Sequence, residues 1–400
     1  VAGMLRRTGN RFRCAIGCTG LVARRDLLTG DWTVLAPTRE QRPNDFSSDQ
    51  AGTPDGASEP VAGPPQHARD IDPFCPFCCG SESATPSAVW SVSLDSNKSP
   101  NPNVTTRVSH PMTKIVAGEQ DNWEVRVVPN KFPAVAPQSL SEDDAETAGL
   151  FPARSLAGGH EVVIESSAHA ERVTEADASL VYLMLLAYRE RIRYWRSVEG
   201  IQYISVFKNC GPAAGASLRH SHSQIVATSV LPFRVKSSLL RCETHRARTG
   251  CSLGCDLIRG ELQEGARVIT VADSFVAFCP FASRVPGLIR ISSLTHVKHF
   301  DEFSESDLDH LASFLWRALR WVDQAYPGKA YNMVLNTCPP RSKASEAFQW
   351  SLDLFPRLNK VAGFEWSSDC MINPVLPETA AEMYRETAAL DDPRRVLSNA

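Results

Sequence analysis

The alternation of apolar and polar residues predicts a β-hairpin near the middle of the chain. Residues 203–207 are rich in β-branched and aromatic side chains, and apolar residues return at 225–227 after a run of small residues. Such patterns are typical of half-buried strands. Residues two apart on an extended chain share one face. We therefore expect His220, His222 and Gln224 to line one surface of the second strand, with Ser221 and Ser223 behind.

Segments before the hairpin predict further strands and one long helix. Residues 32–35 follow a Thr-Gly-Asp turn, residues 123–128 alternate, and residues 161–164 form a short apolar run. Apolar residues at helical spacing run from Thr174 to about residue 198, and either Thr174 or Asp177 is a suitable N-cap. The first half therefore predicts strands, a helix and the hairpin, in that order.

The second half of the chain repeats this order. Residues 286–292 predict a strand, residues 304–326 predict a helix that begins with a Ser-x-x-Asp cap, and residues 331–336 and 349–355 predict two more strands. A repeated order of elements indicates two copies of one unit. We expect an α+β fold with two tandem domains, each an antiparallel sheet with packed helices.

Length and composition agree with this division. Four hundred residues exceed one ordinary core, and we place the domains at residues 21–230 and 231–400. Residues 1–20 are basic but lack the apolar stretch of a signal peptide, and residues 47–71 are rich in Ser, Gly, Pro, Ala and Asp. We expect these two segments to be a disordered leader and a disordered insertion.

Charge and cysteine usage limit the classes of binding partner and the cellular compartment that we expect. The formal net charge of −3 gives no indication of a nucleic-acid or membrane partner. No apolar run approaches the about 20 residues that a membrane-spanning helix needs. The 12 cysteines are unevenly spaced in a long chain. This usage favours reduced thiols and metal ligands, so we expect the cytoplasm.

The hairpin carries the residues most suited to chemistry. Residues 211–215 begin and end with glycine, so their backbone N–H groups can approach an anion closely. One of the two imidazoles can be a nucleophile and the other a metal ligand, while the Gln224 amide can donate to an oxyanion. A lone His-x-His is more often a pair of surface histidines. The small-residue loop and the glutamine favour an active site.

A second motif predicts half of a metal site. Cys75 and Cys78 lie in the sequence Cys-Pro-Phe-Cys, a tight bend on which two thiolates can bind one tetrahedral ion. A redox pair is the alternative interpretation, because no second Cys-x-x-Cys follows closely. If the ion is zinc, histidines elsewhere in the chain must supply the remaining ligands.

The sequence N-x-G-x-x-x-G-x-S-x-x-H-x-H-x-Q, which begins at Asn209, resembles the active-site signature of the galactose-1-phosphate uridylyltransferase family. This family belongs to the histidine-triad (HIT) superfamily and includes ADP-glucose phosphorylases. The resemblance implies two HIT-like domains, of which the first is catalytic. It also implies that His222 is the nucleophile, that Gln224 and Ser217 stabilise the oxyanion, and that Asn209 and Gly215 help to bind substrate.

The same resemblance suggests the remaining zinc ligands and further substrate contacts. It points to His169 and His220 as ligands of Zn²⁺, with His160 as the rival of His169. The family pattern also places three groups at the nucleotide sugar: the arginines of the opening segment, the asparagine of the V-x-P-N-K-F-P-A motif and the glutamate of residues 362–374. In this chain these residues are Arg39, Arg42, Asn130 and Glu365.

The second copy lacks the catalytic residues. Alignment of the two hairpins places Gln349, Ser351 and Asp353 where the first copy has His220, His222 and Gln224. Cys251 and Cys255 have no well-placed pair of histidines, so a second metal site is not expected.

Three functions compete at this point. The first is a uridylyltransferase that moves UMP from UDP-glucose to a hexose 1-phosphate, as in galactose metabolism, by ping-pong transfer through a uridylyl-histidine. The second is an ADP-glucose phosphorylase, and the third is a zinc-stabilised nucleotide-binding protein without turnover. Asn359 stands where some uridylyltransferases have a sugar-phosphate-binding lysine. Family resemblance also implies a homodimer.

Overall fold

We analysed a computed structural model that describes residues 22–35, 71–94, 113–116, 122–135, 150 and 156–390. Arg39, Arg42, the predicted leader and nearly all of the predicted insertion lie outside the described residues. No helix in the described ranges is long and apolar enough to cross a membrane.

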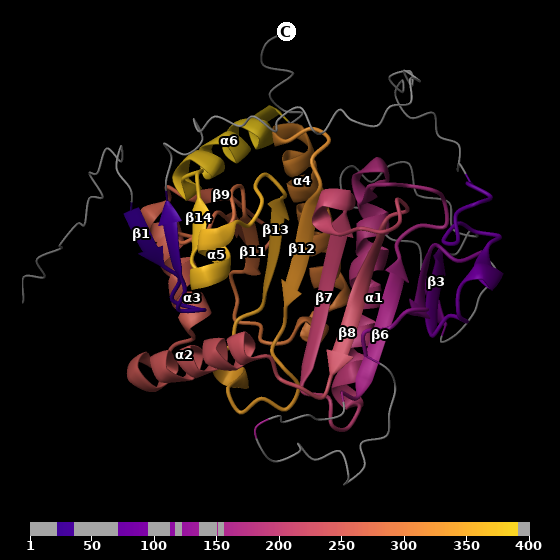
Figure 1. Cartoon of the computed structure of the whole chain (residues 1–400), viewed down its shortest axis with the longest axis horizontal. Helices are drawn as coiled ribbons and strands as arrows, with labels where there is room; N and C mark the ends of the chain where they lie inside the picture. Colours follow the sequence, from indigo (N-terminus) through magenta and orange to yellow (C-terminus); the bar gives the residue numbers. More distant parts are fainter. Residues whose placement is uncertain are drawn as a thin grey trace, which may run out of the picture.

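Eleven of the described strands form one antiparallel sheet (Figure 1). Its order is β4-β3-β5-β6-β8-β7-β12-β13-β11-β10-β9. The strands of the first half are β3 (Trp90–Leu94), β4 (Thr113–Val116), β5 (Val125–Pro129), β6 (Gly158–Ile164), β7 (Tyr203–Cys210) and β8 (His222–Thr228). Those of the second half are β9 (Val268–Ala272), β10 (Phe275–Phe278), β11 (Ile289–Ser293), β12 (Tyr331–Asn336) and β13 (Ser351–Pro356).

The strand order repeats outward from the central pair β7 and β12. It runs β8, β6, β5, β3 on one side, where β4 is added at the edge, and β13, β11, β10, β9 on the other. This symmetry matches the repeat of elements that the sequence predicts. The two halves do not have separate sheets, however, because β7 pairs with β12 along the boundary. That pairing satisfies the backbone groups that two exposed edge strands would leave open.

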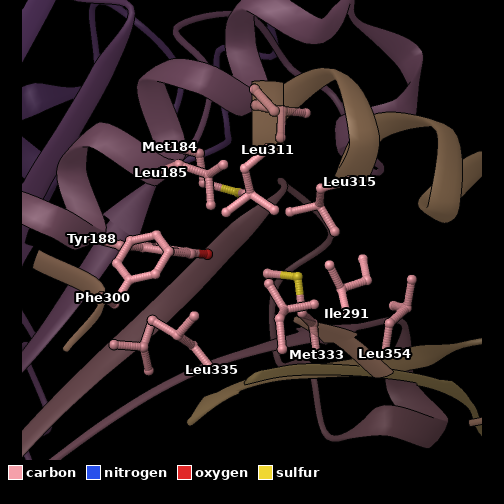
Figure 2. Close-up of a cluster of buried hydrophobic side chains, with 14 of the residues drawn as sticks. Met184, Leu185, Tyr188, Ile291, Phe300, Leu311, Leu315, Met333, Leu335 and Leu354 are labelled. Carbon is pink, nitrogen blue, oxygen red and sulfur yellow. The ribbon is translucent and has the colours of Figure 1, made fainter. Parts of the chain in front are cut away.

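Two long helices, α1 (Ala178–Ser197) and α4 (Glu305–Ala325), contact each other and pack over the sheet. Figure 2 shows Met184 and Leu185 of α1 beside Leu311 and Leu315 of α4, above Met333 of β12. All five side chains are at most 1% exposed. Burial at this level contributes about 1.5–3 kcal/mol for each large apolar side chain. The core therefore lies between the helices and one face of the sheet.

The ends of these helices are set by their caps. The Asp177 side chain accepts a hydrogen bond from Ser179 N, so of the two predicted caps Asp177 is the one used. Residues Val173–Glu175 instead form a separate 3-10 turn. Ser304 and Asp307 form the predicted cap of α4, because each side chain accepts from the backbone N–H of the other residue.

A smaller sheet lies beside the second half of the large one (Figure 1). It contains β1 (Val22–Arg25), β2 (Trp32–Leu35) and β14 (Met371–Asn373), with β14 parallel to β2. Arg24 is buried and pairs with Glu378 of α6 (Pro377–Leu390), and α6 packs against α4. The first strand of the chain is thereby attached to its last helix.

Four strand predictions need adjustment and several helices were not predicted. β12 has the predicted bounds. β6 begins three residues earlier than expected, and β5, β11 and β13 begin two or three residues later. The helices not predicted are α2 (Phe233–Thr249), α3 (Leu253–Glu264), α5 (Gly363–Ser368) and α6. α2 buries only Leu239 and Cys242. With so few core positions, its sequence carries little of the apolar periodicity that identifies a helix.

Candidate active site and metal centre

The loop between β7 and β8 depends on two glycines. Gly211 has φ +83° and Gly215 has φ +93°, a region that disfavours other residues. A Cβ on Gly211 would also lie 2.9 Å from the Cβ of Ala330. The side-chain amide of Asn332, on β12, donates to the Asn209 side-chain oxygen at 2.8 Å and to Ala214 O at 2.9 Å. The loop is therefore fixed to the second half of the sheet.

One ring nitrogen of His222 has no hydrogen-bond partner among the described residues. Its Nδ1 lies 2.8 Å from the backbone oxygen of His220, which can only accept, so Nδ1 carries the proton. Nε2 is then unprotonated and has its lone pair available. Burial lowers the pKa of His222, whose side chain is 6% exposed. The imidazole is consequently neutral at physiological pH, as a nucleophile must be.

Gln224 lies on the same face of β8 as His222. Its side-chain oxygen is 2.7 Å from Nε2 of His160 on β6, and the amide nitrogen of Asn130 is 3.1 Å from that same ring nitrogen. Asn130 also accepts a hydrogen bond from Phe132 N through its side-chain oxygen. Asn130, His160 and Gln224 are distant from one another in the sequence. In the structure they meet on the face of β8 that carries His222.

A second cluster lies on the other side of His222 and has the composition of a metal site. The ligand atoms of Cys75, Cys78, His169 and His220 all lie within 4.8 Å of one another. Nδ1 of His220 is 3.4 Å from the Cys75 sulfur, and Nδ1 of His169 is 3.5 Å from the Cys78 sulfur. Tetrahedral zinc, with Zn–S of about 2.3 Å and Zn–N of about 2.0–2.1 Å, implies S–N distances of about 3.5 Å.

The protonation of His220 also fits a metal ligand. Its Nε2 lies 3.0 Å from the backbone oxygen of Ser166, so the proton sits on Nε2 and Nδ1 faces the two sulfurs. Burial lowers the pKa of His220 to about 4, which keeps the ring neutral. His160 does not join the cluster, because it contacts Gln224 and Asn130 instead. The four side chains thus fit a metal such as zinc.

We expect purified protein to contain about one zinc ion per chain, and Cys75→Ser to lower both the zinc content and the melting temperature. A structural zinc contributes folding free energy, so the two losses should occur together. Metal analysis and thermal unfolding measure them. Cys251→Ser, the same change outside the cluster, should alter neither. An unchanged zinc content in Cys75→Ser, or two zinc ions per chain, would contradict the assignment.

The opposite face of β8 contains a buried polar network. Glu165 is fully buried and Lys208 is 1% exposed, and their charges pair. Glu165 also accepts hydrogen bonds from Ser221 and Ser223, each at 2.7 Å, and Ser223 accepts one from Tyr188. Burial alone would raise the pKa of Glu165, but the Lys208 ammonium and the serine hydroxyls hold it below its ordinary value. The serines lie on the side opposite His222 and Gln224, as their spacing predicts.

The network also reaches the backbone of the candidate nucleophile. The Lys208 ammonium donates to Ser221 Oγ at 2.8 Å and to the carbonyl oxygen of His222 at 3.3 Å. Neither Lys208 nor Glu165 was predicted from the sequence to take part in the site. The available signal was a charged residue directly after each of two predicted strands, residues 161–164 and 203–207.

The other described residues that were predicted to bind substrate are less clearly connected to His222 and Gln224. Ser217 and Gly215 are exposed in the hairpin loop. Glu365 is 8% exposed and accepts a hydrogen bond from Ala362 N, so it caps its own helix, α5. Within the described ranges, no hydrogen bond connects Glu365 to the hairpin. Its role in binding a hexose stays a prediction.

The second copy uses the aligned positions for structure. Asp353 forms two hydrogen bonds with Arg290, both 2.7 Å, and the Gln349 amide donates to Ser292 and Ser293. Among the residues that the structure describes, Cys251 and Cys255 belong to no group of metal-binding side chains.

Comparisons with known proteins agree with this geometry. A sequence model described as galactose-1-phosphate uridyl transferase, N-terminal domain, matches residues 105–232. ADP-glucose phosphorylase of Arabidopsis thaliana is 29% identical over 367 residues, which are 91% of this chain and 92% of that protein. Galactose-1-phosphate uridylyltransferase of Thermotoga maritima is 27% identical over 280 residues, 67% of this chain and 86% of that protein.

Solved structures of an ADP-glucose phosphorylase and of a uridylyltransferase also match this chain. The crystal structure of an A. thaliana ADP-glucose phosphorylase with bound ADP-glucose matches with a TM-score of 0.70 and 28% identity, covering 92% of this chain and 99% of that chain. A uridylyltransferase structure matches with a TM-score of 0.63 at 21% identity, over 92% of this chain and 99% of that chain. The second likeness concerns the fold alone.

Proposed function

Because this chain belongs to the galactose-1-phosphate uridylyltransferase family, we propose that it transfers a nucleotidyl group from a nucleotide sugar through a covalent intermediate on His222. The observation that carries this proposal is the hydrogen bond from His222 Nδ1 to His220 O, which leaves Nε2 unprotonated on the face of β8 that also carries Gln224. A nucleotide-binding protein without turnover would not need this arrangement.

In the first step, Nε2 of His222 attacks the α-phosphorus of the donor. A P–N bond forms, the P–O bond to the sugar phosphate breaks, and the bond electrons leave with the sugar phosphate. A phosphate leaving group is a weak base, so the step needs little help from a general acid. Negative charge grows on the nonbridging oxygens, where Gln224, Ser217 and the amides of the loop can donate hydrogen bonds.

In the second step, an oxygen of the acceptor phosphate attacks the same phosphorus and releases neutral His222. The intermediate must survive until the acceptor arrives. Gln224 assists this survival, because an amide donates a hydrogen bond but cannot take a proton from water as a histidine would. Transfer to phosphate is then favoured over hydrolysis.

We propose ADP-glucose as the donor and inorganic phosphate as the acceptor, which gives ADP and glucose 1-phosphate. The extent and identity of the match to ADP-glucose phosphorylase support this choice. Asn359 supports it as well, since it replaces a lysine with which some uridylyltransferases hold a sugar phosphate. Transfer of UMP from UDP-glucose to galactose 1-phosphate is the second candidate, and the match to the T. maritima enzyme supports it.

Initial rates with the two donor–acceptor pairs test the donor assignment. We expect kcat/KM for ADP-glucose with phosphate to exceed that for UDP-glucose with galactose 1-phosphate by at least about tenfold, because a site shaped for one base leaves polar groups unpaired around the other. His222→Ala provides the blank for both pairs. Faster turnover of the UDP-glucose pair would assign the second candidate.

Zinc, when bound, would hold the strand in place and would not activate water, because four protein ligands leave no open coordination position. The cluster would connect Cys75 and Cys78, before β3, to His220, two residues before β8 begins. We also propose that the two halves are tandem HIT-like domains and that the enzyme is a homodimer. We also propose a reducing compartment such as the cytoplasm, because Cys75 and Cys78 would serve as thiolate ligands of the metal.

A further inference from the structure

The side chain of Gln224 can help the reaction in only one of its two orientations. Its NH₂ group must face the phosphate, because its carbonyl oxygen would repel the growing negative charge. A glutamine side chain turns easily about its last bond. The contact with His160 is the one side-chain hydrogen bond of Gln224 among the described residues. This contact therefore decides which end of the amide faces the substrate.

The sheet places the two residues on the same face. His160 on β6 lies opposite Val226 on β8, and Gln224 lies two residues before Val226. Opposite residues of an antiparallel pair share a face, so His160 and Gln224 are diagonal neighbours. Their side chains meet at 2.7 Å, between Nε2 of the ring and the amide oxygen. Both residues are half-buried.

The backbone determines which nitrogen of His160 carries the proton. Ala134 N lies 3.1 Å from His160 Nδ1, and a backbone N–H can only donate. Nδ1 is therefore the acceptor, and the proton of the neutral ring is on Nε2. From there it is donated to the Gln224 oxygen. The amide nitrogen of Asn130 lies 3.1 Å from Nε2, but both groups are donors in this tautomer, so they form no hydrogen bond with each other, while the Asn130 side-chain oxygen accepts from Phe132 N.

We propose that His160 is a positioning residue that turns the amide NH₂ of Gln224 toward the reacting phosphate. The inference rests on the proposed function, since it assigns a task to a residue behind the oxyanion donor. The backbone N–H of Ala134, after β5, determines the tautomer of His160. The tautomer in turn determines the orientation of the Gln224 amide, so that its NH₂ group faces the substrate. His160 itself does not touch the reacting atoms.

Two substitutions separate the hydrogen bond from the shape of the ring. His160→Phe keeps a planar ring but cannot donate, so the amide of Gln224 can take both orientations. We expect it to slow formation of the nucleotidyl-enzyme about tenfold, the effect of about 1.4 kcal/mol in the barrier. His160→Gln places an amide NH₂ near the position of Nε2 and should recover the rate to within about threefold of wild type.

A double-mutant cycle provides a test that a purely structural role would fail. Gln224→Ala removes the donor and should slow the half-reaction about 10²-fold. His160→Phe should then have no further effect in the Gln224→Ala background, because no amide remains to be oriented. If the two losses multiply instead, His160 acts independently of Gln224 and the proposal is wrong. Equal rates for His160→Phe and wild type would also overturn it.

These outcomes are separate from those of the proposed function. If wild-type protein forms no nucleotidyl-enzyme, the proposed function has failed, and the tautomer can still be measured directly. Long-range ¹H–¹⁵N spectra of protein labelled at histidine distinguish the two neutral tautomers, with His160→Gln used to assign the signal. We expect His160 in the Nε2–H form. Observation of the Nδ1–H form would refute the proposed orientation whatever the activity.

Discussion

Replacing His222 with alanine is expected to lower turnover by about 10⁴-fold or more. The substitution removes the nucleophile, and in enzymes with covalent intermediates no neighbouring group supplies that bond. His220 is not a substitute, because its Nδ1 faces the sulfurs of Cys75 and Cys78. Steady-state assays with ADP-glucose and phosphate measure the loss.

Folding and zinc content of His222→Ala serve as its controls. Both should stay near the wild-type values, since His222 is not among the four clustered side chains. Substantial remaining turnover in a folded, zinc-containing variant would show that the chemistry does not pass through His222.

Replacing Lys208 with methionine is expected to lower the free energy of unfolding by about 3–5 kcal/mol. The change leaves Glu165 charged and fully buried, and breaking a buried ion pair on one side costs about that much. Two serines would still donate to Glu165, but the opposite charge would be missing. Denaturant unfolding monitored by circular dichroism measures the difference.

Arg219→Met is the matched control for this prediction. Arg219 pairs with Glu171, but the two side chains are 84% and 53% exposed. An exposed pair of this kind contributes about 0–1 kcal/mol. A loss below about 1 kcal/mol for Lys208→Met would show that the network beneath β8 contributes little to stability.

The sequence predicted those features that depend on local spacing. Alternation placed His222 and Gln224 on one face of β8 with Ser221 and Ser223 behind them, and the cap of α4 was identified from Ser304 and Asp307. A strand has a fixed period of two, and a capping box has a fixed offset of three residues. Both patterns can be read without knowledge of the fold.

Contacts between distant strands could not be predicted in this way. His160 meets Gln224 across 64 residues, and Asn332 reaches Asn209 across 123 residues. Such pairs depend on strand order and register, which the residues alone do not determine. Resemblance to a family supplied His169 as a metal ligand, because Cys-x-x-Cys by itself indicates only two ligands. The resemblance did not indicate that His160 contacts Gln224, because that contact depends on the pairing of β6 with β8.

Detection of the nucleotidyl-enzyme tests the account most directly. Protein mixed with ADP-glucose, without an acceptor, should gain the mass of one adenylyl group in intact-mass spectrometry, and a peptide digest should locate it on His222. The adduct should disappear when phosphate is added, and His222→Ala should form none. If only UDP-glucose gives an adduct, and that adduct is uridylyl, the covalent mechanism would be supported but the donor would be UDP-glucose. Folded, zinc-containing protein that gains no mass from either donor would contradict the covalent mechanism.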